Sequence, residues 1–123
     1  MSAERPTIAG LLERAMALDP EGEALRDGGQ AYTWREVGGR VARRARVLAE
    51  LGLERGDRVA VLAHNGAPFF ELYFAAASLG AVLMPLNLRL TAREQARILT
   101  DGEPRLLVAE TGFAELAREA EVE

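Results

Sequence analysis

Residues 58–85 read RVAVLAHNGAPFFELYFAAASLGAVLMP, and this stretch decides the fold. It begins with a short, continuous apolar run, which is typical of a strand buried on both faces of a sheet. A His-Asn-Gly break at residues 64–66 ends the run, and Pro68 suits the first turn of a helix. Residues 68–79 are apolar almost all round, which predicts a buried helix. A second buried strand over residues 81–85 completes a β-α-β unit.

The same alternation continues towards the end of the chain. Thr91-x-x-Glu94 is a capping box that opens a helix to about Thr100, with Gly102 as its stop. Residues 105–109 predict a third strand, and a last helix follows it. Strands separated by helices of this length pair in parallel through right-handed crossovers.

The sequence before residue 57 predicts a different order of secondary-structure elements. It predicts a helix over residues 7–18 and a β-hairpin around Asp-Gly-Gly at residues 27–29. A second helix is expected over residues 33–51, opened by a capping box that pairs Thr33 with Glu36.

These patterns predict an α/β fold made of two parts. Residues 1–56 form a lead-in of a helix, a β-hairpin and a capped helix. Residues 57–123 form a parallel, three-strand β-α-β-α-β-α unit. The whole chain, 1–123, is expected to be one domain or part of one.

Composition excludes several classes of protein. The net charge is −4 and the pI is about 5.1, so no overall basic field favours nucleic acid. Cysteine and lysine are both missing, which excludes a thiolate nucleophile and a lysine-based mechanism within this chain. His64 is the single histidine, so a multi-histidine metal site is not expected and no metal ligand is assigned. With neither a signal-peptide pattern nor a long apolar run, we expect a cytoplasmic protein without a membrane span.

Candidate binding residues fall just after the first two parallel strands. His64 and Asn65 follow the first strand, and Asn87 and Arg89 follow the second. The carboxyl edge of an open parallel sheet is where ligands usually bind, so these four residues are predicted to line a crevice. Arg89, just before a helix N-terminus, suits a phosphate or carboxylate. The alternatives are an Asn-Gly turn at the first position and an ion-paired or exposed arginine at the second.

Two further charged features have simpler interpretations. Glu71 is the only charge in the apolar helix, and we expect it near the helix start, within reach of solvent; a buried catalytic carboxylate is the alternative. The arginines between residues 35 and 46 are expected to form a solvated helix face, with anion or partner binding as the alternative. No residue of the chain is assigned a catalytic role.

Taken together, several segments resemble the N-terminal region of AMP-forming acyl-CoA synthetases, which are adenylate-forming ligases. The run AYTWREVGGRVARRARVLAELGLERGD resembles the first conserved segment of that family, an aromatic-Thr-x-x-Glu-Leu pattern that opens a helix. ASLGAVLMPLN resembles the second, a Gly-Ala-x-x-x-Pro-x-Asn pattern. The likeness runs from about Thr7 to Glu110, and the order and spacing of the segments make it specific.

The resemblance implies a ligase that activates a carboxylate with ATP and magnesium and then transfers the acyl group to CoA. It also implies that the phosphate-binding loop, the magnesium ligand and the catalytic lysine lie downstream, so the chain would be a fragment that binds none of these cofactors alone. Its partner would be the remainder of the ligase polypeptide. In some such ligases the arginine of the Asn-x-Arg that matches residues 87–89 approaches a CoA phosphate, which implies this role for Arg89.

Two alternatives from other classes remain open. A three-strand sheet with open edges would suit a stand-alone oligomerisation module, such as a homodimer. A closed sheet would instead suit a small α/β domain that binds a phosphorylated small molecule.

Overall fold

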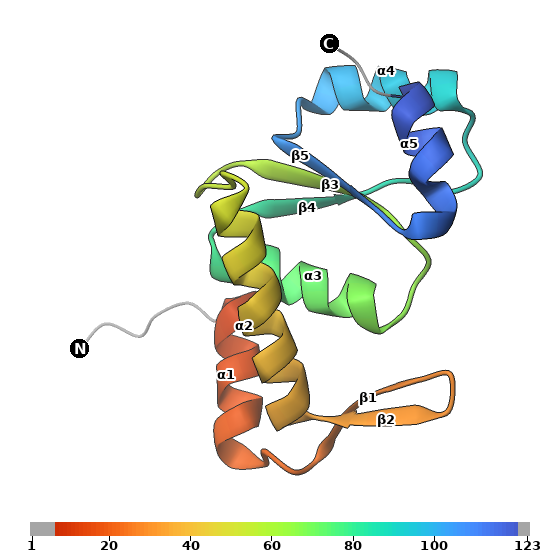
Figure 1. The fold of residues 1–123 in the computed structure, drawn as a ribbon. Helices are drawn as coiled ribbons and strands as arrows, with labels where there is room; N and C mark the ends of the chain where they lie inside the picture. The colour runs from red at the N-terminus through yellow and green to blue at the C-terminus, as the bar shows by residue number, and fades with distance from the viewer. Residues whose placement is uncertain (1–6, 121–123) are drawn as a thin grey trace.

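The computed structural model describes residues 7–120, and its centre is the strand β3 (Arg58–Leu62). β4 (Val82–Pro85) pairs with one edge of β3 and β5 (Leu106–Ala109) with the other, so the sheet order is β4-β3-β5. Both pairings are parallel. The expected α/β class and parallel three-strand unit are therefore confirmed (Figure 1).

Helices cover both faces of this sheet (Figure 1). The chain passes from β3 through α3 to β4 and then crosses β3 through α4 to reach β5, so right-handed crossovers place these two helices on opposite faces. One face carries α1 (Ile8–Leu18), α2 (Trp34–Glu50) and α3 (Ala67–Ser78). The other carries α4 (Ala92–Gly102) and, after the short 3-10 turn Thr111–Phe113, α5 (Ala114–Ala120).

Alternation along β3 divides the core into two layers. Val59 and Val61 belong to the cluster with α1, α2 and α3, whereas Ala60 and Leu62 belong to the cluster with α4 and α5. All four side chains are at most 1% exposed. This complete burial is why β3 reads in the sequence as a continuous apolar run.

The end of β4 shows how proline shapes this edge of the sheet. Pro85 is the last residue of the strand and lies in register with Val61. Because proline has no N–H, the next hydrogen bond comes from Leu86, whose N–H donates to the Val61 carbonyl at 2.9 Å. The chain then leaves the sheet.

The hairpin of β1 (Glu23–Asp27) and β2 (Gln30–Thr33) is antiparallel, as predicted. Gly28 and Gly29 both have positive φ (57° and 84°), which a two-residue hairpin turn requires. Asp27 also serves a second element, because its carboxylate accepts the backbone N–H of Ala67 at 2.8 Å, at the N-terminus of α3.

Both predicted capping boxes are present, at Thr33 with Glu36 and at Thr91 with Glu94. The predicted stop of α4 at Gly102 is wrong by one residue. Gly102 is still helical, and the left-handed residue is Glu103 (φ 46°). A Cβ at Gly102 would lie 2.5 Å from Cε of Met84 in β4, so the flexible end of the Met84 side chain would have to shift to admit it.

Between residues 7 and 120, no helix combines the length and the apolar character needed to cross a membrane.

Candidate functional site

The carboxyl edge of the sheet opens into a crevice because two neighbouring loops leave in opposite directions. The loop after β3 leads to α3 on one face, and the loop after β4 leads to α4 on the other. Such a parting of loops is the usual ligand position in open α/β sheets. The resulting cavity has a volume of about 320 Å³. We call it the carboxyl-edge crevice, and it is lined by Ala63, His64, Asn65, Phe69, Pro85, Leu86, Asn87, Leu88 and Arg89.

All four candidate residues from the sequence thus line a single cavity. His64 is exposed, and its Nδ1 lies 3.0 Å from Oε2 of Glu110, at the end of β5. The ring also packs against Phe113, with 5.0 Å between ring centroids. These two contacts connect the loop after β3 to the chain after β5 and hold the imidazole beside the crevice that it lines.

The other wall of the crevice is held by the backbone around Asn87. The side-chain oxygen of Asn87 accepts the N–H of Arg89 at 3.0 Å, which closes a local turn. The backbone carbonyl oxygen of Asn87 accepts a hydrogen bond from the side-chain amide nitrogen of the fully buried Gln95 at 2.5 Å. The loop is therefore anchored to α4, while the Arg89 side chain is exposed and pairs with no carboxylate of residues 7–120.

The lining residues suit an anion better than a reaction centre. The guanidinium of Arg89 and the amide of Asn65 supply donors, and none of the nine lining residues is acidic. Glu110 on the far side of His64 weakens the positive field there. The lining also offers no hydroxyl, thiol or amine nucleophile. The crevice thus offers hydrogen-bond donors and no acidic lining residue, and anion binding there stays a prediction.

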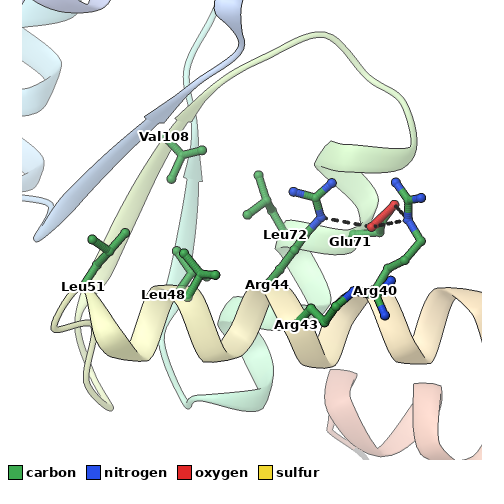
Figure 2. A pocket seen from close by; sticks show the side chains of 9 residues that line it. Arg40, Arg43, Arg44, Leu48, Leu51, Glu71, Leu72 and Val108 are labelled. Atoms are coloured by element: carbon green, nitrogen blue, oxygen red, sulfur yellow. Dashed lines mark hydrogen bonds and ion pairs between the residues drawn. The ribbon is translucent and has the colours of Figure 1, made fainter.

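A second cavity, of about 480 Å³, lies where α2, α3 and β5 meet (Figure 2). We call it the arginine pocket, and it is lined by Arg40, Arg43, Arg44, Val47, Leu48, Leu51, Glu71, Leu72 and Val108. In Figure 2, the guanidinium groups of Arg40 and Arg44 reach from α2 to Glu71 on α3. Arg43 lies on the same face of α2 without an ion pair among the described residues.

The expected solvent contact of Glu71 is wrong, because its side chain is only 1% exposed. Nε of Arg40 donates to both carboxylate oxygens, at 2.8 and 2.9 Å, and Nε of Arg44 donates to one of them at 3.0 Å. The hydrogen-bonded ion pairs with the two arginines offset the hydration that the carboxylate loses on burial. The hydrogen bond to Glu71 raises the pKa of Arg40 despite an opposing desolvation effect.

This ion cluster corrects the expected solvated arginine face at Arg40 and Arg44 only, because Arg35, Arg43 and Arg46 are exposed as expected. The side chains of Arg40 and Arg44 are only about a third exposed (34% and 33%), and Arg40 lies over the Tyr32 ring, 5.1 Å from its centroid. The signals for the cluster were present in the sequence, as two arginines four residues apart and one acid in an apolar helix. Their pairing depends on how α2 and α3 are rotated relative to each other, which spacing alone does not fix.

No group of three or more His, Asp or Glu side chains within residues 7–120 forms a metal-binding cluster.

A family model described as "AMP-binding enzyme" matches residues 12–123. The chain is 36% identical over 109 residues to the peroxisomal benzoate–CoA ligase of Arabidopsis thaliana, a match that covers 89% of this chain and 19% of that protein. It is 39% identical over 102 residues to a feruloyl-CoA synthase from Amycolatopsis sp., covering 83% of this chain and 21% of that protein. The chain thus spans about a fifth of the length of the curated relatives it matches.

Solved structures match in the same way. The inhibitor-bound N-terminal domain of FACL13 from Mycobacterium tuberculosis superposes with a TM-score of 0.89 at 31% identity, over 97% of this chain and 31% of that one. A fatty acyl CoA synthetase from the same organism superposes with a TM-score of 0.87 at 32% identity, over 91% of this chain and 23% of that one.

Proposed function

The chain belongs to the AMP-binding enzyme family, and we propose that it is the N-terminal structural portion of an ATP-dependent acyl-CoA synthetase. The parent reaction joins a carboxylate and ATP into an acyl-adenylate with release of pyrophosphate, and then forms a thioester with CoA. The observation that carries the proposal is the length of the match. It runs from residue 12 to residue 123, yet corresponds to only about a fifth of each curated relative.

In this proposal the chain supplies architecture and no catalytic residue. The sequence contains no lysine and no Ser/Thr/Gly-rich phosphate loop, so the groups that handle ATP, magnesium and the reacting carboxylate come from further polypeptide. Residues 1–123 are then one N-terminal subdomain, with residues 1–56 as its lead-in and 57–123 as its parallel α/β part. A cytoplasmic location stays a prediction, and the A. thaliana relative is named as peroxisomal.

We assign the carboxyl-edge crevice a supporting role in CoA binding. Arg89 is exposed at the crevice and free of carboxylate partners within residues 7–120, which suits a phosphate of the CoA nucleotide. Asn65 and His64 line the same cavity as further donors, and Asn87 holds the Arg89 backbone in place.

The proposal is tested first by acyl-dependent ATP–pyrophosphate exchange with the purified chain. Acetate, decanoate and benzoate serve as acids, and the M. tuberculosis fatty acyl CoA synthetase with decanoate serves as the active control. We expect no exchange above background from the isolated chain, because no residue in it carries out the chemistry. Acyl-dependent exchange by the chain alone would contradict the proposed function.

The role of Arg89 is tested by NMR titration with the adenosine bisphosphate that forms the nucleotide end of CoA. Arg89→Ala removes a charge-assisted hydrogen bond worth about 1.5 kcal/mol, so we expect roughly tenfold weaker binding. Arg93→Ala is the matched control, since Arg93 is also exposed but lies on α4 outside the crevice. Equal weakening by both substitutions, or shifts outside the crevice, would rule out this assignment.

A further inference from the structure

The helix α2 carries a stripe of side chains along the arginine pocket, which meets the core stripe at the buried Leu48. Residues of the arginine pocket recur along it at spacings of three and four, which places them on one face of the helix: Arg40, Arg43, Arg44, Val47 and Leu48, followed by the C-cap residue Leu51. The first half of this stripe is cationic and the second half is apolar. Val47 and Leu51 are 53% and 59% exposed, which is high for side chains of this size.

The cationic half has more charge than its carboxylate neutralises. Three arginines share the pocket with the single acid Glu71, so its formal charge is +2 in a chain whose net charge is −4. Both paired arginines bind Glu71 through Nε, which leaves Nη donors of Arg40 and Arg44 for a further acceptor. Arg43 has no ion pair within residues 7–120.

The apolar half continues onto the sheet. Leu48, Leu51 and Leu72 line the pocket together with Val108 of β5. In the described sheet β5 pairs only with β3, so its outer edge is open. Leu48 and Leu72 are buried, so the exposed apolar part is Val47 and Leu51. An open strand edge beside exposed apolar side chains is a surface that further polypeptide usually covers.

We propose that the arginine pocket is a docking surface for a polypeptide segment from the remainder of the ligase. That segment places a carboxylate side chain against the arginines and apolar side chains against Val47 and Leu51. This inference rests on the proposed function, and the chain covers only 23% of the M. tuberculosis fatty acyl CoA synthetase, so most of such a ligase lies outside it. Because the pocket carries a net positive charge, an acidic segment complements it best.

A second copy of the chain is a poorer occupant of this surface. A two-fold symmetric contact would place the arginines of one copy close to those of the other. Like charges brought together across an interface weaken association.

The test measures binding of synthetic peptides to the isolated chain. The probes are overlapping fifteen-residue peptides, on the order of one helix or strand with its flanks, from the M. tuberculosis synthetase outside the matched region. Arg43→Glu and Val47→Asp alter the pocket without touching the Glu71 ion pairs. Arg46→Glu and Ala49→Asp are matched controls, because they make the same kinds of change at exposed α2 positions outside the pocket. Thermal melting of all four variants checks that each is folded.

We expect at least one peptide that combines acidic and apolar residues to bind the wild-type chain. Its affinity should fall about tenfold or more in each pocket variant and less than about threefold in each control. The inference is wrong if no peptide binds, or if pocket and control variants bind equally. It is also wrong if light scattering shows a wild-type dimer that Arg43→Glu dissociates, since a second copy would then be the occupant.

Failure of this inference is distinguishable from failure of the proposed function. The exchange assay reports on catalysis by the chain alone and does not depend on the pocket variants. The absence of both exchange and Arg43-dependent peptide binding would leave the proposed function intact and refute only the docking surface.

Discussion

At the scale of single residues, Glu71 links α2 to α3. We predict that Glu71→Ala destabilises the fold by about 2–3 kcal/mol, towards the low end for a broken buried ion pair because the arginines are partly exposed. The loss arises because two guanidinium groups remain at the helix interface without their carboxylate. Urea unfolding followed by circular dichroism measures it.

The control at this scale is an exposed ion pair. Oε1 of Glu21 lies 2.5 Å from Nη2 of Arg35, and the two side chains are 65% and 68% exposed. Glu21→Ala should change the free energy of unfolding by about 0.5 kcal/mol or less. If the two substitutions cost the same, Glu71 does not link the helices as described.

Single residues also mark how far the sequence informs the site. His64, Asn65, Asn87 and Arg89 could be grouped in advance, because parallel strands bring their carboxyl ends to one edge. The contact of His64 with Glu110 could not, since it joins positions 46 apart and depends on the lateral order of the strands. Whether a ligand occupies this crevice stays a prediction.

At the scale of secondary-structure elements, the capping box of α4 holds the helix that begins just beyond Arg89. Thr91 Oγ1 accepts the N–H of Glu94 at 3.2 Å, and the Glu94 carboxylate accepts the N–H of Thr91 at 3.1 Å. We predict that Thr91→Ala costs about 1 kcal/mol at pH 7. Thr100→Ala is the matched control, because the Thr100 hydroxyl donates to Ala96 within the same helix and does not cap it. That control should change stability by about 0.5 kcal/mol or less.

The same capping box makes the stability of the fold depend on pH in a predictable direction. Hydrogen bonds from the backbone and side chain of Thr91 lower the pKa of Glu94 below its ordinary value of 4.5. A lowered pKa in the folded state stabilises the fold above the unfolded-state pKa, and this contribution is lost as the pH falls through the folded-state pKa. The stability difference between wild type and Thr91→Ala should therefore shrink as the pH is lowered below about 4.5. A difference that stays constant down to acid unfolding would contradict this account.

At the scale of the whole molecule, periodicity and capping predicted the elements but not their lateral arrangement. The sequence indicated three parallel strands, yet it could not show that β5 returns to the far side of β3. Burial follows the strand order: the central strand β3 is almost wholly buried, whereas every described side chain of the edge strand β5 is only partly buried. The expected burial of the second strand is wrong, because Val82 and Pro85 of β4 are exposed. β4 and β5 lie at the edges of the sheet, and an apolar run alone does not distinguish an edge strand from a central one.

The hydrogen bond from Ala67 to the Asp27 carboxylate has a consequence for how this chain can be divided. It joins the hairpin of the lead-in to the first turn of α3, and the apolar cluster around Val59 draws on both parts as well. The predicted division near residue 56 therefore does not separate two independent cores. Anyone shortening the protein there would separate a helix from the side chain that caps it, and would split one cooperative unit into two peptides that each lack half of a core.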